Sequence, residues 1–224
     1  MCERIGKENK NYDGIYQQIL ELMPFIKKSL NKRYGKAYTK ALIPKADAEY
    51  RDMLNRSDDI GRDNPMASNT YECLVFLAIW KAADGKISVE DLRAISKDVL
   101  STPIMKVMGI LINANKASGI KRIQKMMERD AKWLYEHPQY KKYSWDFHFD
   151  EKKHKDGFYY YFTQCPLNTF ARREGYLEVL PVMCDIDHIT ASLMHAKLNR
   201  KYTLASGGKV CDYWFVGDKM KNPK

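Results

Sequence analysis

The sequence predicts an α+β protein in which a helical N-terminal half packs against a small antiparallel β-sheet. Apolar residues recur at helical spacing from about residue 12 to residue 137. From residue 144 onward, short aromatic stretches alternate with polar residues, as they do in half-buried strands. We therefore expect a helical region over residues 1–137 and an α+β region over residues 138–224, as two units or one continuous domain. The second region should contain a cysteine-lined pocket.

Apolar stripes, caps and breakers predict the individual helices. Pro24 should break or kink the first stripe, and the turn residues of 56–68 predict a loop. Asn69 resembles an N-cap for a segment that is apolar nearly all round and belongs in the centre of a bundle. The expected helices cover about residues 12–30, 36–54, 71–83 and 120–134, with two more that begin at Ser88 and Pro103.

Strands are expected only after residue 140. Residues 144–150 alternate between aromatic and polar side chains, and the aromatic run 158–163 follows a charged connector, so the two should form an antiparallel hairpin. Two later strands are expected near residues 201–205 and 210–216, on either side of the turn at Gly207-Gly208. The later strands would extend the same small sheet.

The composition indicates which kinds of binding partner to expect. The chain has 224 residues and a formal net charge of +10, but its lysines are dispersed and it carries no nucleic-acid-binding motif, so nucleic acid is not the expected partner. No apolar run approaches the roughly 20 residues that span a bilayer, and the N-terminus resembles no signal peptide. Five cysteines, an odd number, favour reduced thiols. We expect a cytoplasmic protein that acts on a small molecule, and the oligomeric state stays open.

Three cysteines of the C-terminal region lie in polar, turn-flanked settings. Cys165 precedes a proline, Cys184 is followed by an Asp-Ile-Asp-His run, and Cys211 precedes Asp212. A thiol that only fills a core does not need such neighbours, whereas a nucleophile or metal ligand does, because neighbouring groups set the pKa of the thiol. Cys73, inside an apolar run, is expected in the core.

A helix that begins near Pro181 would place several reactive side chains on one of its faces. At helical spacing, one face of this segment is aliphatic and the opposite face carries a cysteine, an aspartate and two histidines. The second face is expected to line a pocket, although it could also be a polar outer surface. The first face holds Val182, Ile186, Ile189 and Leu193, and the second holds Cys184, Asp187, His188, Ala191 and His195.

Three chemistries could use this face, and the sequence leaves all three open. Cys184 could be a nucleophile, with His188 or His195 as its base and Asp187 orienting that base. Alternatively, Asp187 or Asp212 could activate water directly as a general base. As a third choice, a divalent metal such as zinc could be held by the thiols of Cys165, Cys184 and Cys211 together with a histidine.

Substrate-binding groups are expected around the same thiols. Arg172 could pair with a substrate carboxylate, because the guanidinium fork matches that geometry, although a surface role fits it equally well. The backbone N–H groups of Gly207 and Gly208 could hold an anionic group. Cys165 and Thr203 complete the expected binding set.

The C-terminal half resembles the L-2-amino-thiazoline-4-carboxylic acid hydrolase family over about residues 140–216. The resemblance is carried by Phe162-Thr163-Gln164-Cys165-Pro166, by Gly175-Tyr176-Leu177-Glu178-Val179-Leu180-Pro181 leading to Cys184 and Asp187, by Arg200-Lys201-Tyr202-Thr203-Leu204-Ala205, and by Cys211-Asp212-Tyr213. It implies ring-opening hydrolysis of a cyclic C–N or C–S bond, with Cys165, Cys184, Asp187, Cys211 and Asp212 matching the family pattern.

The expected function is therefore hydrolysis of a thiazoline or cyclic amidine carboxylate. Water or the Cys184 thiolate would attack the ring carbon between the heteroatoms, while Asp187 and His188 move protons. No cofactor is required by this scheme. The same half also resembles the vinyl-reductase-type ligand-binding domains, which implies a second reading as a non-catalytic small-molecule- or metal-binding module.

Overall fold

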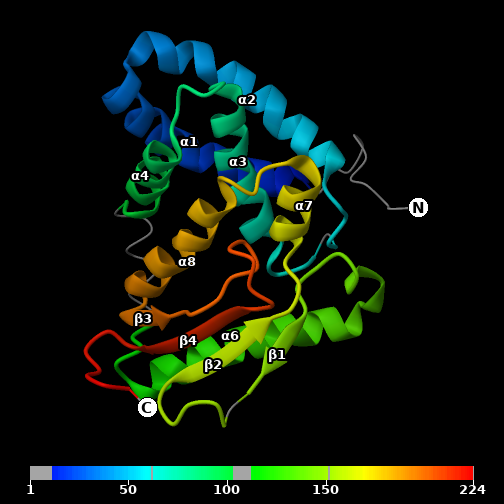
Figure 1. Ribbon diagram of the computed structural model, residues 1–224, viewed down its shortest axis with the longest axis vertical. Helices are drawn as coiled ribbons and strands as arrows, with labels where there is room; N and C mark the ends of the chain where they lie inside the picture. The colour runs from blue at the N-terminus through cyan, green and yellow to red at the C-terminus, as the bar shows by residue number, and fades with distance from the viewer. Residues whose placement is uncertain (1–11, 62, 103–111, 151, 224) are drawn as a thin grey trace.

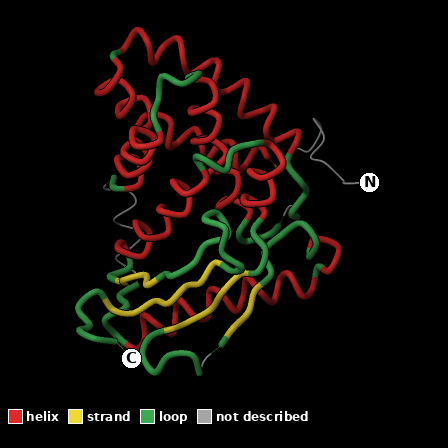
Figure 2. Tube along the Cα trace, viewed as in Figure 1, coloured by secondary structure: helices red, strands yellow, loops and turns green. Residues whose placement is uncertain are grey.

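The computed structural model describes residues 12–61, 63–102, 112–150 and 152–223, and it confirms the α+β class. Figure 1 shows the helices α1–α4, α7 and α8 above a four-stranded sheet, with α6 passing behind strands β2 and β4. The trace in Figure 2 shows the strands lying side by side at one end of the molecule, and all of them come from the C-terminal half of the chain. The elements are α1 (Tyr12–Tyr34), α2 (Lys36–Arg56), α3 (Ala67–Ala82), α4 (Val89–Leu100), α6 (Ala117–Glu136), a 3-10 turn (Pro138–Tyr140), β1 (Phe147–Phe149), β2 (Phe158–Phe162), α7 (Pro166–Glu174), α8 (Leu180–Leu193), β3 (Ala196–Asn199) and β4 (Cys211–Gly217).

The N-terminal helices follow the apolar stripes, and Pro24 does not break the first of them. Helix α1 continues through Pro24, although a proline removes one backbone hydrogen bond. Ile26 and Leu30, in the turns that follow, are 1% and 0% exposed, so their burial offsets the lost bond. The helix expected to begin at Pro103 lies outside the described residues.

The expected burial of α3 and the expected N-cap of α4 are both confirmed. Helix α3 packs against α2, and Leu74 and Leu77 are fully buried, as expected for a helix that is apolar nearly all round. It begins two residues before Asn69, so Asn69 is not its N-cap. Ser88 caps α4, because its hydroxyl accepts a hydrogen bond from the Asp91 N–H at 3.0 Å.

The sheet has the order β1-β2-β4-β3, with every pair antiparallel. The expected hairpin is confirmed, with Phe147 opposite Phe162 and Phe149 opposite Tyr160. In β2 and β4, alternate side chains such as Tyr160 and Tyr213 lie directly opposite each other and share one face. That face points toward α8, since the Tyr213 hydroxyl donates a hydrogen bond to that helix.

The prediction of a strand near residues 201–205 was wrong. The strand before β4 is β3, over Ala196–Asn199, and residues 201–205 form a turn-rich loop. The backbone N–H groups of Lys201 and Tyr202 donate to the carboxylate of Asp212 instead of to a neighbouring strand. The carboxylate of Asp212 therefore replaces the backbone acceptor that a strand partner would supply.

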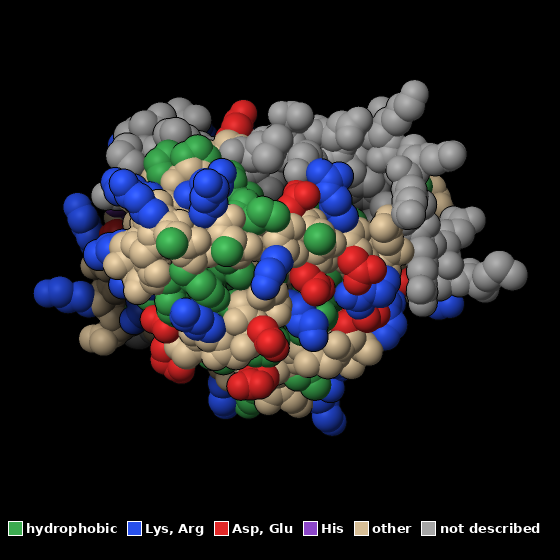
Figure 3. Space-filling view, turned by 90° about the horizontal axis from the view of Figure 1, so that it is seen from above, with side chains coloured by type: hydrophobic (Ala, Val, Ile, Leu, Met, Phe, Trp, Pro, Cys, Tyr) green, Lys and Arg blue, Asp and Glu red, His purple; other side chains and the backbone are tan. Residues whose placement is uncertain are grey.

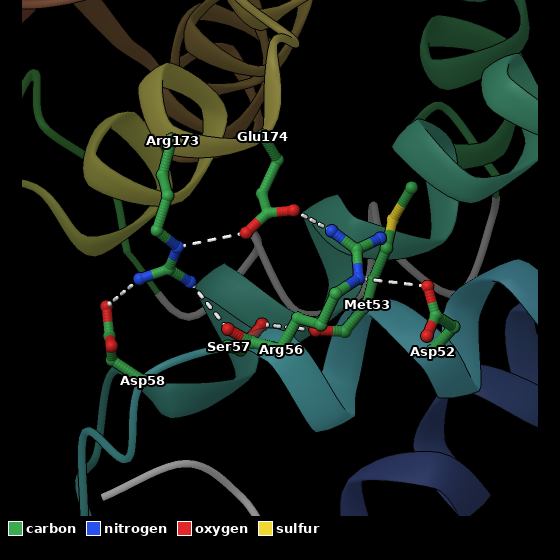
Figure 4. Close-up of polar contacts among 7 residues, drawn as sticks. All are labelled: Asp52, Met53, Arg56, Ser57, Asp58, Arg173 and Glu174. Carbon is green, nitrogen blue, oxygen red and sulfur yellow. Dashed lines mark hydrogen bonds and ion pairs between the residues drawn. The ribbon is translucent and has the colours of Figure 1, made fainter. Parts of the chain in front are cut away.

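An ion-pair network joins the two halves of the chain (Figure 4). The Arg173 guanidinium, at the end of α7, lies 2.9 Å from Asp58 and 2.9 Å from Glu174. Glu174 also pairs with Arg56 at the end of α2, and Arg56 contacts Asp52 at 2.9 Å. Because these charges are partly buried and linked in a network, they fix α7 against α2 more firmly than isolated surface pairs would.

One cluster of buried side chains runs through both halves. It extends from Ile26 in α1 to Phe215 in β4 and includes α3 and α8. Among the described residues, no helix has the length and apolar character needed to cross a membrane. The division of the chain at residue 137 stays a prediction.

Candidate functional site

A buried arginine lies at the centre of the candidate site. Arg200 follows β3, and its side chain is 5% exposed. Its three nitrogens donate to the backbone oxygen of Asp212 at 3.2 Å, to the backbone oxygen of Cys184 at 3.0 Å and to the carboxylate of Asp187 at 2.8 Å. Arg200 therefore joins α8 to β4 and fixes Asp187 in one orientation.

Asp187 receives a second hydrogen bond from the sheet. The Tyr213 hydroxyl donates to Asp187 Oδ2 at 3.0 Å, and the Arg200 guanidinium lies 4.0 Å from the centre of the Tyr213 ring. Both contacts use Oδ2, and none of the described residues hydrogen-bonds Oδ1. The Asp187 side chain is 37% exposed, so a fixed carboxylate reaches solvent above a buried cation.

Four thiols lie in the electrostatic neighbourhood of Asp187. Burial raises the pKa of Cys73, Cys165, Cys184 and Cys211, and the charge of Asp187 acts in the same direction on all four. The thiol of Cys184 also interacts with those of Cys73, Cys165 and Cys211. The thiols are therefore protonated at neutral pH. Cys73 comes from α3, far away in sequence.

Cys165 occupies the residue before α7. Burial raises the pKa of Cys165 to about 12 and outweighs the opposite effect of the backbone N–H groups of Leu167 and Asn168 at the start of α7. The side chain of Cys165 makes no cap hydrogen bond with the described residues. Beside it, Asn168 Oδ1 is buried and has no hydrogen-bond partner among the described residues. A buried acceptor of this kind favours a bound group that donates to it.

Asp212 and the glycine turn make hydrogen bonds that stabilise the loop between β3 and β4. The carboxylate of Asp212 accepts bonds of 2.6–3.1 Å from the backbone N–H groups of two residues, and Asp212 is 9% exposed. The N–H groups of Gly207 and Gly208 donate to the backbone oxygens of Leu204 and Thr203. These two N–H groups, expected to hold an anion, are thus used within the loop.

The glycines of this loop also show why it is compact. Gly207 has a φ of 84°, in the left-handed region, and a Cβ at Gly208 would lie 2.8 Å from the Thr203 backbone oxygen. The Thr203 hydroxyl lies 2.7 Å from that of Ser206. Leu204 N–H donates to Cys211 Sγ at 3.1 Å, so the loop folds back on one of the thiols.

Arg172 and the two histidines lie at the periphery. Arg172 is exposed, and its guanidinium donates to the Leu204 backbone oxygen at 3.0 Å. His188 is exposed. His195 lies beyond the end of α8 with a φ of 51°, and its ring is 3.6 Å from the carboxylate of Asp218.

Helix α8 is buried on more than one side, which changes the expected division into two faces. Val182, from the expected core face, and Ala191, from the opposite face, are both fully buried. The helix packs against α4 and against β3, and Ile186, Ile189 and Leu193 of the expected core face are only half-buried. Cys184 and Asp187 are half-buried, whereas His188 is on the exposed side.

The third expected chemistry needs thiols and a histidine that converge on one metal ion. Among the described residues, no group of three or more His, Cys, Asp or Glu side chains is arranged to hold a metal ion. The cysteine-lined pocket expected from the sequence stays a prediction.

Sequence reasoning missed two residues of this site. Arg200 and Tyr213 both lie within the runs that carry the family resemblance, but only the fold brings them to Asp187. Their signal was an arginine directly after β3, whose residues alternate between apolar and polar, and a tyrosine at an inward position of β4. Cys73, expected to be only a core residue, also lies beside the site.

Comparison with known proteins gives one match. A family model described as L-2-amino-thiazoline-4-carboxylic acid hydrolase matches residues 68–215, more than half of the chain. No curated protein and no solved structure matches. The matched range begins in α3 and ends in β4, so it contains all four thiols together with Asp187, Arg200 and Tyr213.

Proposed function

Because the chain belongs to the L-2-amino-thiazoline-4-carboxylic acid hydrolase family, we propose that it hydrolyses a small heterocyclic carboxylate of the thiazoline or cyclic amidine type. The reaction opens the ring at a C–S or C–N bond. The observation that supports this most directly is the carboxylate of Asp187, which is fixed through one oxygen by Arg200 and Tyr213 and is open to solvent.

The proposed step is attack of water on the ring carbon that lies between two heteroatoms. A C–O bond forms and becomes the carbonyl of the product, and the bond from that carbon to the ring sulfur or nitrogen breaks. One proton of the water ends on the departing atom and the other on the nitrogen that was doubly bonded to the carbon. Asp187 Oδ1 accepts the proton of the water as general base, since Oδ2 is held by Arg200 and Tyr213.

The raised pKa values of the thiols favour a role as proton donor over a role as nucleophile. A raised pKa leaves Cys184 neutral at pH 7, and a neutral thiol can donate a hydrogen bond or proton to the departing heteroatom. Cys184 belongs to the same helix turn as Asp187, and the two groups interact electrostatically. We therefore assign attack to water and the donor role to Cys184.

The substrate carboxylate needs a cation, and Arg172 is the candidate for it. Arg172 is exposed, and its contact with the Leu204 backbone oxygen holds the guanidinium over the loop whose Leu204 N–H donates to Cys211 Sγ. A guanidinium binds a carboxylate through two parallel hydrogen bonds. The unpartnered Asn168 Oδ1 is a candidate acceptor for the exocyclic amino group of such a ring.

The experiment is a ring-opening assay on 2-amino-thiazoline-4-carboxylate, followed by NMR or mass spectrometry of the product. Asp187→Asn should lower kcat by about 100-fold or more, as expected on loss of a general base. Asp185→Asn is a matched control, because Asp185 lies on the same helix and pairs with Arg93 at 2.7 Å. Its kcat should stay within about threefold of wild type. Wild-type activity in Asp187→Asn would refute the mechanism, and no turnover in the wild type would refute this substrate class.

The raised pKa values of the four thiols also favour a second candidate, a binding module without catalysis. Such a module would bind the heterocycle and return it unchanged. Calorimetry with the same compound distinguishes the two, because binding without product formation supports the module.

A further inference from the structure

A hollow lies between α1 and α2, on the opposite side of the fold from the sheet. It has a volume of about 460 Å³, which is within the range of small-molecule sites. Lys27 and Asn31 line it from α1, and Lys36, Lys40 and Ile43 line it from α2. The two helices meet at a single residue, Gly35, whose φ of 82° turns the chain sharply between them.

Three lysines give the hollow positive charge. Lys27, Lys36 and Lys40 are exposed, and none of them pairs with an acidic side chain among the described residues. Lys36 is also the first residue of α2, and the first turn of that helix contains no acidic residue and no side-chain cap. Three ammonium groups therefore act on one small volume, whereas the opposite dipoles at the end of α1 and the start of α2, which meet at this junction, offset each other.

The walls of the hollow are largely apolar. Ile43 is half-buried, Pro44 lies beside it, and the methylene chains of the lysines cover the remaining side. Thr39 also lines the hollow, but its hydroxyl already donates to the Gly35 backbone oxygen at 3.0 Å. Figure 3 shows the molecule from this side, where hydrophobic side chains lie between separate Lys and Arg side chains. The lysines at the rim would contact a charged group of a ligand, and the apolar walls would contact a hydrocarbon part of the same ligand.

We propose that this hollow, the α1–α2 site, binds a small amphipathic anion. The carboxylate or phosphate of the ligand lies among Lys27, Lys36 and Lys40, and its apolar body lies on Ile43 and Pro44. Charge complementarity selects an anion, and the apolar walls select one with a hydrocarbon portion over a simple inorganic ion. The site shares no residue with the Asp187 site, so the proposal does not depend on the proposed hydrolase function.

Calorimetric titration with octanoate tests the proposal on the full chain. Octanoate should bind more tightly than 1-octanol, which lacks the charge, and more tightly than inorganic phosphate, which lacks the apolar body. The triple variant Lys27→Gln/Lys36→Gln/Lys40→Gln should weaken octanoate binding by about tenfold, since an exposed charge contributes up to about threefold to fivefold.

A control variant separates a local effect from one of net charge. Lys116→Gln/Lys121→Gln/Lys125→Gln removes the same charge from exposed positions at and near the start of α6 and should bind octanoate as the wild type does. Equal weakening in both triple variants, or equal affinity for octanoate and 1-octanol, would overturn the proposal. Circular dichroism spectra of both variants should match that of the wild type, because all six lysines are exposed.

Discussion

Replacement of Arg200 tests the centre of the candidate site. Arg200→Met keeps most of the side-chain volume but removes the hydrogen bonds to Asp187, to the Cys184 backbone oxygen and to the Asp212 backbone oxygen. Removal of one partner of a fully buried ion pair costs about 3–5 kcal/mol. The Asp187 side chain is 37% exposed, so water relieves part of this cost, and we expect a loss of about 2–3 kcal/mol.

The assay is equilibrium unfolding in urea, followed by circular dichroism, combined with a double-mutant cycle. Asp187→Asn and the double variant with Arg200→Met should show a coupling energy of about 1–2 kcal/mol, because the two side chains are in direct contact. Arg200→Lys should not restore stability, since an ammonium cannot make the three-way contact of the planar guanidinium. Arg172→Met is the control, and it should cost at most about 1 kcal/mol because Arg172 is exposed and makes one hydrogen bond within the described part of the chain. A loss below about 0.5 kcal/mol for Arg200→Met, with no coupling, would refute the reasoning.

Three further predictions concern the loop, the thiols and acid stability. Asp212→Asn should destabilise the fold by about 1–3 kcal/mol in thermal unfolding, because the carboxylate accepts two backbone N–H groups, and an unchanged Tm would contradict its structural role. Because burial raises the pKa of Cys165 and Cys184, iodoacetamide at pH 8 should label both at least about tenfold more slowly in the native than in the unfolded protein, as measured by peptide mass spectrometry. Rapid native labelling of Cys184 would instead favour a thiolate nucleophile. The hydrogen bond from Tyr34 lowers the pKa of Asp91 below its unfolded value of about 3.9, so this contact stabilises the fold above about pH 4 and is lost as the pH falls through the folded pKa. Tyr34→Phe should therefore be less stable than wild type at pH 7, by at most about 1 kcal/mol, and the difference should narrow toward pH 2.

The parts of the fold that depend on neighbouring residues could be read from the sequence. The aromatic alternation predicts the β1–β2 hairpin, and Ser88 predicts the start of α4, because both signals act within a few residues. The strand expected at residues 201–205 failed because Asp212, ten residues further on, takes the backbone N–H groups of this segment. Local propensity does not include an acceptor of that kind.

By itself, the sequence determined the α+β class, the region that carries the candidate site and the residues that resemble a hydrolase family. The tertiary structure decided which of these residues meet. It placed Arg200 and Tyr213 on Asp187, brought Cys73 from α3 to the C-terminal thiols, and turned the N–H groups of the glycine loop inward. The physical reason is that side-chain spacing fixes helices and strands locally, whereas ion pairs and thiol burial depend on which elements pack together across the core.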